Sequence, residues 1–167
     1  MPISDFLLQE FDAEMANTRK TLERVPADKG AFAPHTKSMK IEHLAPHIAQ
    51  LPQFGVTVLT TPELDFATSS FTRLPFESPA QLVRALEENA AKVRAALKST
   101  PDSAWSDTWK LSWGGKPIFT GTRFAAYRQM FLNHIVHHRA QLGVYLRLND
   151  LPVPATYGPS ADDTMGF

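Results

Sequence analysis

Apolar side chains recur at helical spacing over most of this chain, and that spacing constrains the fold more than any other feature. Between residues 4 and 25, one helical stripe is formed by Leu7, Phe11, Met15, Thr18 and Leu22. Between residues 78 and 99, a second stripe is formed by Leu82, Leu86, Ala90, Val93 and Leu97. Because residues three or four apart lie on one face of an α-helix, both stretches predict amphipathic helices.

Three serines stand where helices are expected to begin. Ser4, Ser38 and Ser78 each precede a helical pattern, and Pro79 follows at the first position of the third helix. A serine hydroxyl can accept a hydrogen bond from an amide of the first turn. Amides of the first turn have no partner within the helix, so proline, which has no amide hydrogen, is well tolerated there. We therefore expect the first three helices to be capped at these serines.

Two prolines, Pro46 and Pro52, fall inside the predicted second helix. Each removes a backbone donor and crowds the preceding turn, so we expect the helix to be kinked or interrupted there. The region 60–77 has the composition of a loop, and a last long helix is predicted over about 122–148. The tail, 149–167, is rich in proline, glycine and small residues, and we expect it to be extended.

The period changes before the last helix. Trp109, Leu111 and Trp113 alternate with polar residues, and Gly114 and Gly115 follow. Alternation with a glycine pair predicts a small hairpin or extended excursion. The next apolar run contains a proline at position 117, which suits an edge strand because it cannot donate to a neighbour.

Four helices with one interruption predict an all-α fold, a four-helix bundle. The length of 167 residues fits a single domain, 1–167, with one core. Apolar residues make up 43% and charged residues 20%, which is typical of a globular protein. We find no internal repeat.

Charge and cysteine content exclude several classes of function. Lysine plus arginine and aspartate plus glutamate are equal at 17 each, so no basic surplus predicts a nucleic-acid partner. The absence of cysteine excludes disulfides, thiolate metal sites and a cysteine nucleophile. No signal peptide or membrane span is recognisable, so we expect no membrane partner and a cytoplasmic location.

The six histidines lie in two groups far apart in the sequence: His35, His43 and His47, then His134, His137 and His138. Helical residues four apart have Cβ atoms about 5–6 Å apart, so side chains at this spacing can converge on one ion. Each group contains one such pair, at positions 43 and 47 and at 134 and 138. One histidine from the second helix and two from the last would give the three-nitrogen set, with an open position, that is common in catalytic zinc sites.

Spacing alone leaves other interpretations open. Histidines at helical spacing also occur as hydrogen-bonded core residues or as solvated side chains, and a histidine of near-neutral pKa can act as a general base without a metal. His137 lies about 60° around the helix from the His134 side chain. We therefore expect His137 to lie at the surface or beside the ligand histidines.

Several segments resemble a known family. The stretches HHRAQLGVYLR and LPVPATYGPSADD resemble the C-terminal signature of the DinB-like superfamily, also called the YfiT-like metal-dependent hydrolases. PHTKSMKIEHLAPHIAQLPQF resembles its second helix, and FDAEMANTRKTLERVP its first. The resemblance implies a four-helix bundle with a three-histidine metal site, often in a homodimer. It places the ligands on His47, His134 and His138.

Five further residues are candidates for the surroundings of this site: His43, His137, Arg139, Gln141 and Tyr145. His43 would close the shell if it acted as a fourth ligand. Gln141 and Tyr145 share the direction of His134 and could hydrogen-bond the ligands or a metal-bound water, or each other as buried polar residues. Arg139 is expected to be a structural or anion-binding residue, or an arginine paired at the surface.

The resemblance favours an enzyme. Characterised relatives are similar to thiol-dependent transferases and isomerases that use a low-molecular-weight thiol as cosubstrate, and hydrolysis is the competing chemistry. A divalent transition metal, zinc or nickel, and a small-molecule substrate are implied, whereas no catalytic side chain is evident. The alternative is a non-catalytic, metal-stabilised bundle that acts as a stress-related binding or dimerisation module.

Overall fold

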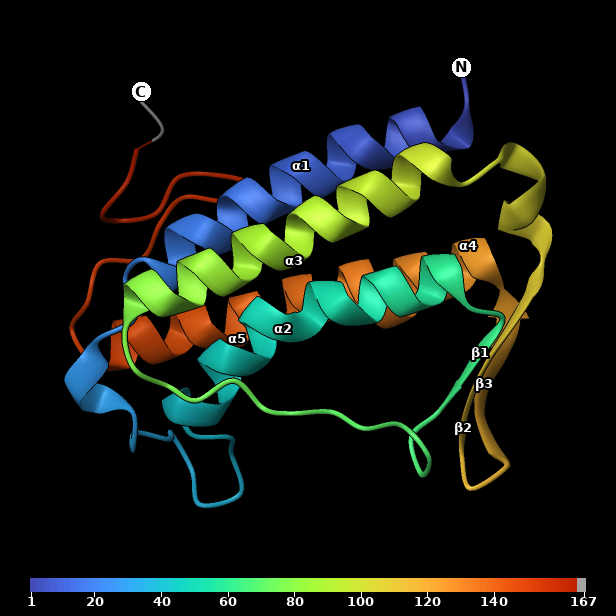
Figure 1. The fold of residues 1–167 in the computed structure, drawn as a ribbon. Helices are drawn as coiled ribbons and strands as arrows, with labels where there is room; N and C mark the ends of the chain where they lie inside the picture. The colour runs from blue at the N-terminus through green and yellow to red at the C-terminus, as the bar shows by residue number, and fades with distance from the viewer. Residues whose placement is uncertain (165–167) are drawn as a thin grey trace.

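The computed structural model of the protein describes residues 1–164. Figure 1 shows its elements. The α-helices are α1 (Ile3–Leu22), α2 (Ile41–Thr60), α3 (Pro79–Ser99), α4 (Arg123–Ala125) and α5 (Asn133–Leu148). The strands are β1 (Glu63–Asp65), β2 (Thr108–Trp113) and β3 (Lys116–Thr122). Two 3₁₀ turns and a π-helical segment complete the elements: η1 (Ala27–Lys29), η2 (Asp102–Ser106) and η3 (Ala126–Leu132).

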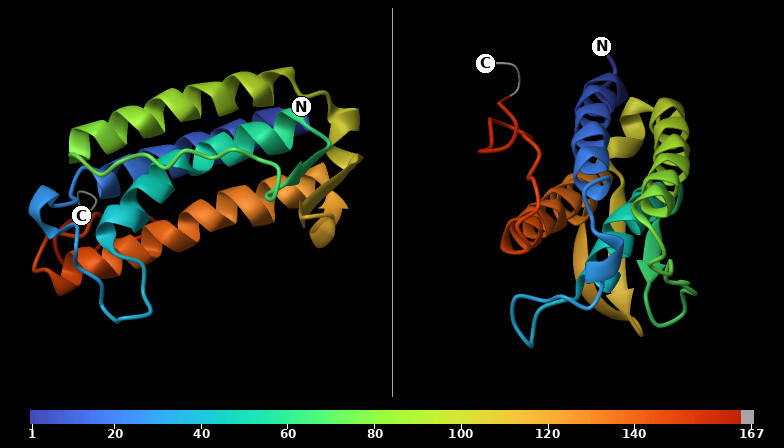
Figure 2. Two further views of the ribbon diagram at one scale, coloured as in Figure 1. Left: turned by 60° about the horizontal axis from the view of Figure 1, so that its bottom comes forward. Right: turned by 90° about the vertical axis from the view of Figure 1, so that its left-hand side faces the viewer.

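The four long helices, α1, α2, α3 and α5, pack against one another around one apolar core. α3 contacts both α1 and α2, and α5 contacts the same two helices from the other side. Figure 2 shows the sheet at one end of this helical body, remote from the tail. Both predicted apolar stripes are buried, with Leu7 and Phe11 of α1 and Leu82 and Leu86 of α3 in the core. The described part of the chain is therefore mostly helical, as predicted.

The prediction of helix starts is correct for one serine of three. The Ser78 hydroxyl accepts a hydrogen bond from the Gln81 amide, and α3 starts at Pro79 as expected. Ser4 instead lies inside α1, where its hydroxyl donates to the carbonyl of Thr100 at 3.0 Å. The second helix starts three residues after Ser38, at Ile41. The first amides of α2 bond to loop carbonyls instead, with Ile41 donating to Phe32 and Glu42 to Gly30.

The prolines of α2 do not interrupt it. Pro46 and Pro52 both lie within the continuous helix Ile41–Thr60, and both are buried. Figure 1 shows that the first turns of α2 are inclined to the rest of the helix, as expected when proline removes a hydrogen bond and crowds the preceding turn.

The all-α prediction is wrong in one respect, because the excursion is part of a three-stranded sheet. β2 and β3 form the predicted hairpin, with Gly114 and Gly115 at positive φ of 56° and 77° in its turn. β1, in a region predicted to be loop, pairs in parallel with β2 and places Leu64 beside Leu111. The strand order is β1-β2-β3, so Pro117 lies on an edge strand, as predicted.

The last predicted helix has a break in its regular period. Thr122 caps α4, and after one turn the backbone continues as the π-helical η3 before α5 begins. The ring of Phe131 in η3 packs against Gly55 of α2, where an added Cβ would lie 2.7 Å from the ring. This close contact brings α2 to the segment that leads directly into α5.

The tail beyond α5 is irregular up to the last described residue, and the prediction that it is extended is wrong, because residues 153 and 155 hydrogen-bond to residues 160–163 and the tail folds back on itself. The Tyr157 hydroxyl donates to Glu14 of α1, and the Asp162 carboxylate accepts from the amide of Val153. The last residues of the predicted tail, 165–167, lie outside the described part. Among the described helices, none combines the length and apolar character that crossing a bilayer requires.

Candidate metal centre

The fold brings together the three histidines that the sequence predicts as ligands. His47 comes from α2, and His134 and His138 come from α5. One ring nitrogen of each lies within 4.8 Å of those of the other two. The Nε2 atoms of His134 and His138 are 2.8 Å apart. The three side chains are close enough to share one ion.

Hydrogen bonds orient the two rings on α5. Nδ1 of His134 donates to the carbonyl of Met130 at 3.3 Å, and Nδ1 of His138 donates to the side-chain oxygen of Gln141 at 2.8 Å. Both rings therefore carry their proton on Nδ1, which leaves the Nε2 lone pairs facing each other. Two lone pairs at this separation repel unless a proton or a cation lies between them. The donor set thus fits a divalent metal, because an outer hydrogen bond of this kind commonly fixes a ligand histidine.

The site favours neutral imidazoles. The pKa of His47 is lowered to about 4, first by burial and then by the charges of His138, His134 and Arg73. Burial is also the largest cause that lowers the pKa of His134 and of His138. A neutral imidazole is the form that binds a metal, so at neutral pH no proton has to be displaced before binding.

The other histidines of the two groups lie outside this cluster. His43, one turn before His47, is exposed and lines a neighbouring cavity, and it is absent from the described metal-ligating group. The ring of the exposed His137 packs against that of His138, with centroids 4.9 Å apart. Tyr145 is buried and packs edge-on against Phe32 rather than on the histidines. Of the neighbours predicted from direction alone, Gln141 contacts a ligand histidine through a hydrogen bond and Tyr145 does not.

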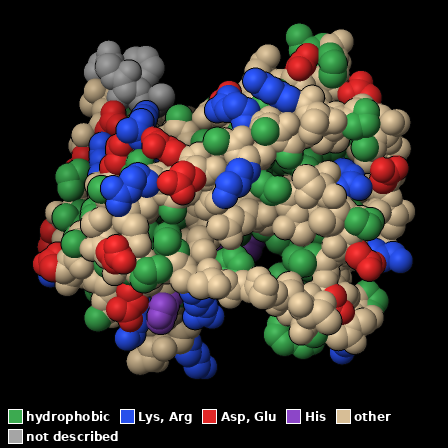
Figure 3. Space-filling model, in the orientation of Figure 1, with side chains coloured by type: hydrophobic (Ala, Val, Ile, Leu, Met, Phe, Trp, Pro, Cys, Tyr) green, Lys and Arg blue, Asp and Glu red, His purple; other side chains and the backbone are tan. Residues whose placement is uncertain are grey.

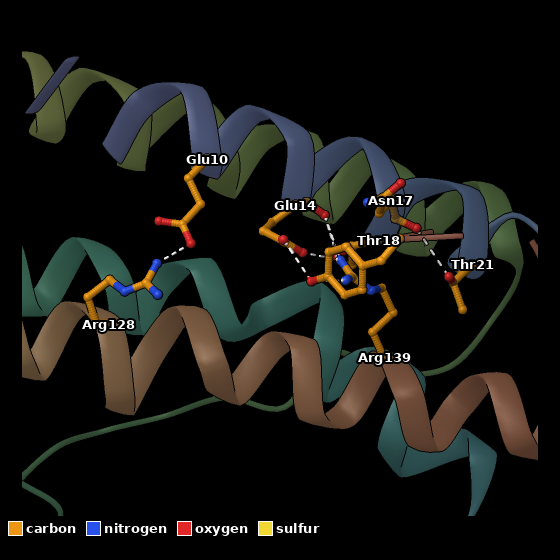
Figure 4. A network of polar contacts seen from close by, with 8 residues as sticks. Glu10, Glu14, Asn17, Thr18, Thr21, Arg128 and Arg139 are labelled. Carbon is orange, nitrogen blue, oxygen red and sulfur yellow. Dashed lines mark hydrogen bonds and ion pairs between the residues drawn. The ribbon is translucent and has the colours of Figure 1, made fainter. Parts of the chain in front are cut away.

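Arg139 lies on another face of α5, against α1, and forms a buried ion pair. It is 3% exposed and contacts the Glu14 carboxylate at 2.6 Å, while its second amino group donates to the Tyr157 hydroxyl at 2.8 Å. Figure 4 shows this network between α1 and α5. This burial is inconsistent with the interpretation of Arg139 as an arginine paired at the surface. Glu14 was missed, although an acid beside the apolar stripe of the first helix is a signal that could have identified it.

A cavity of about 520 Å³ adjoins the cluster at His47. It is lined by the first half of α2 and by residues 71–76, which run past that helix in Figure 1. Figure 3 shows a hollow on this face of the molecule with a histidine side chain inside it. Gln50 and Arg73, which line this cavity, were not predicted. Gln50 lies three residues after His47 on the same helix, whereas nothing in the sequence places the loop that carries Arg73.

Known protein structures with a similar fold include DinB-like proteins and an isomerase. The chain is similar to crystal structures of DinB-like proteins from Bacillus subtilis (20% identity, TM-score 0.66, 87% of this chain and 94% of that one) and Bacillus cereus (19%, 0.66, 90% and 95%). It is also similar to the mycothiol-dependent maleylpyruvate isomerase, at 17% identity and a TM-score of 0.62, over 86% of this chain and 61% of that one. At these identities the likeness shows the fold alone. A search of curated proteins finds no significant match.

The sequence itself shows the family. The sequence model of the DinB family matches residues 2–165, which is nearly the whole chain. The resemblance found in the four quoted segments therefore extends through the middle of the protein. The chain belongs to the DinB family.

Proposed function

We propose that His47, His134 and His138 bind one divalent transition metal, zinc or nickel, and that the protein is a metal-dependent enzyme. The observation that carries the proposal is the meeting of three neutral ring nitrogens within 4.8 Å beside a cavity. No fourth histidine, cysteine or acid joins the group among the described residues. Three histidines with an open position are typical of catalytic rather than structural zinc sites.

We further propose that the reaction is thiol-dependent transfer or isomerisation. A bound metal would supply Lewis acidity and lower the pKa of a thiol or of water at its open position. The chain has no cysteine, so a reacting thiol would have to come from a small cosubstrate. The similarity to an isomerase that depends on mycothiol supports this choice over hydrolysis.

The residues of the chain have separable roles in this proposal. Met130 and Gln141 hold the two α5 rings with Nε2 directed inward, and α2 supplies His47 from the opposite side. The cavity beside His47 would receive the small-molecule substrate. The homodimer and the cytoplasmic location stay predictions from the sequence.

Metal analysis of protein purified without a histidine tag tests the site. We expect about one ion per chain, lost in His138→Ala and retained in the matched variant His43→Ala. Native protein that takes up neither zinc nor nickel would contradict the metal site. Loss of the ion in His43→Ala would instead favour a closed shell and the alternative function, a metal-stabilised binding or dimerisation module.

The reaction type is tested with an electrophilic substrate in the presence and absence of a small thiol. We expect turnover to require both the thiol and the metal, and to fall to background in His138→Ala. Turnover of an ester that is independent of thiol would favour hydrolysis. Absence of both activities in metal-loaded protein would favour the non-catalytic alternative.

A further inference from the structure

The cavity beside His47 contains a side-chain clamp made by Gln50. This amide is only 8% exposed and lies one turn after His47 on α2. Its nitrogen donates to the carbonyl of Thr72 at 2.9 Å, and its oxygen accepts from the amide of Leu74 at 2.9 Å. Both hydrogen-bonding groups of one buried amide thus hold the backbone on either side of Arg73.

The residue between the two clamped positions is a cation. Arg73 lines the cavity together with His47, and its charge is one of those that lower the pKa of His47. Its guanidinium forms no ion pair with any carboxylate of residues 1–164. Glu42, the acid that lines the same cavity, pairs with Lys40 at 3.2 Å. Arg73 is exposed, but the hydrogen bonds on either side of it fix its backbone beside the cavity. A guanidinium at this place that pairs with no carboxylate of residues 1–164 is suited to bind an anion from solution.

Building on the proposed metal site, we propose that Arg73 binds a carboxylate of the ligand whose reactive end lies at the histidine cluster. Gln50 is then a positioning residue that acts through Arg73. A guanidinium presents paired donors that match the two oxygens of a carboxylate, and such bonds are stronger than those between neutral groups. The carboxylate can belong to the thiol or to the molecule that reacts with it.

Two matched pairs of probes distinguish these sources. For the thiol, 3-mercaptopropionate is compared with 3-mercaptopropionamide, and for the other reactant, succinate is compared with succinamide. Dissociation constants are measured by titrating ¹⁵N-labelled, zinc-loaded protein and following the amide signals of residues 72–74. In at least one pair we expect the carboxylate to bind about five-fold tighter than the amide, the size of a partly exposed ion pair.

The variants assign this preference to one side chain. Arg73→Gln should bring the carboxylate-to-amide ratio to about one, and Arg73→Lys should retain part of it because the charge remains. Arg84→Gln, which removes an exposed arginine of α3 outside the cavity, should leave the ratio unchanged. Gln50→Ala should lower the ratio although Arg73 is still present. Arg73→Gln alone decides the matter if Gln50→Ala does not fold.

Equal affinities within both pairs for native protein, or an unchanged ratio in Arg73→Gln, would overturn the proposal. Metal content is measured in parallel and should be the same in native protein and Arg73→Gln. If the native chain takes up no metal, the proposed metal site fails. The same titrations on metal-free protein still decide the role of Arg73, because its charge does not depend on the ion.

Discussion

Arg139 and His138 are adjacent in the sequence but act on different faces of α5, because consecutive residues of an α-helix point about 100° apart. The Arg139 guanidinium is buried against the Glu14 carboxylate and also donates to the hydroxyls of Thr18 and Tyr157. Removing two charges from water costs several kcal/mol, which their attraction offsets only when the remaining donors and acceptors are also satisfied. In the network of Figure 4 the guanidinium also donates to the Glu14 carbonyl, whereas the carboxylate atom Glu14 Oε2 contacts it as an ion pair without a hydrogen bond. The network joins α1, α5 and the tail.

Arg139→Met should destabilise the protein by about 3–5 kcal/mol, because it leaves the Glu14 carboxylate buried without a cation. The free energy of unfolding from urea denaturation measures this. A double variant with Glu14→Leu should recover most of the loss, since no unpaired charge then remains. Tyr157→Phe removes one hydroxyl and should cost only about 1 kcal/mol. A loss below 1 kcal/mol for Arg139→Met alone would contradict this account.

At the residue scale, the sequence predicts what depends on one helix and misses what depends on two segments. The spacing of His134 and His138 places both on one face, and the same geometry places Gln141 beside them. Arg139 was singled out, but its partner Glu14 lies 125 positions away on another helix. Helical spacing relates residues within one helix and cannot predict such a contact. Arg73 was missed for the same reason, because backbone groups of a loop determine its position.

The approach of α2 to the last helical stretch depends on a glycine. A Cβ at Gly55 would lie 2.7 to 2.9 Å from three atoms of the buried Phe131 ring, which has no room to move. The contact sets the spacing between the helix that carries His47 and the segment that precedes His134. Small changes here should therefore affect the candidate metal centre as well as the core.

Gly55→Ala should destabilise the protein by about 1–2 kcal/mol, since overpacking costs more than the gain in helix propensity returns. It should also weaken metal binding, because α2 is displaced from the helix that carries the other two ligands. Gly143→Ala on α5 is the matched control, since its Cβ would meet only Val153 at an ordinary 3.8 Å. That variant should gain up to about 1 kcal/mol. Thermal unfolding and metal titration compare the stability and the metal affinity of the two variants. Equal changes in both variants would mean that the Gly55 contact does not set the position of α2.

The sheet is held at its turn by one carboxylate. Asp65 of β1 accepts hydrogen bonds from the amides of Ala67, Gly114 and Gly115 at 2.8 to 2.9 Å. These bonds hold the pKa of Asp65 below its ordinary value of 3.8. The ionised form is the one that the folded hairpin binds, so its contribution is present above pH about 4 and is lost as the pH falls through the folded pKa.

Asp65→Asn should therefore be less stable than native protein at pH 7, and the difference should shrink below pH about 4. Asparagine keeps the shape of the side chain but replaces the charged acceptor and one of its oxygens. Urea denaturation of both proteins from pH 7 to pH 3 measures the gap. A gap that stays constant over this range would mean that the charge of Asp65 does not stabilise the hairpin.

Elements were predicted well where their own residues determine them. The start of α3 follows from Ser78 and Pro79, and the β2–β3 turn follows from a glycine pair. β1 was missed because three residues without alternation become a strand only when β2 pairs with them. The π-helical η3 was missed because apolar periodicity does not distinguish a π-helical turn from an α-helical one.

The candidate metal centre joins parts of the molecule that are distant in the sequence. His47 lies on α2 and the other two ligands on α5, so an ion at this place would connect two helices already in contact. A ligand that binds only the folded state stabilises that state by mass action. A free ligand concentration of about 100 times the dissociation constant raises the free energy of unfolding by about 2.7 kcal/mol. Metal binding at the proposed site would thus be coupled to the stability of the whole molecule.

Zinc at that concentration should raise the midpoint of thermal unfolding by about 5–10 °C for a chain of this size. The shift should vanish in His47→Ala and persist in His43→Ala, whose exposed ring lies outside the cluster. Calorimetry with and without metal measures the unfolding midpoint of the native protein and of both variants. A shift of equal size in His47→Ala would mean that the ion binds elsewhere.

For the whole molecule, the helical content and the family were predictable because both apolar stripes and the family segments lie in the sequence itself. The additional strand and the order of the sheet depend on how the helices bring β1 to β2. The cavity was not predictable, since one of its walls is a loop without a pattern of its own. Periodicity therefore predicts helices more reliably than the surfaces between them.

The parallel pairing of β1 with β2 also has a consequence for the order of folding. Residues 63–65 pair with residues 110–112, and the whole of α3 lies between them, whereas β2 and β3 are joined by a tight turn. Closing a long loop costs entropy before its contacts form, so distant pairings are slow. We expect the hairpin to form early and β1 to join it only after α2 and α3 have met. In pulsed hydrogen exchange, amides that bond across the β1–β2 edge should become protected after those of the β2–β3 hairpin.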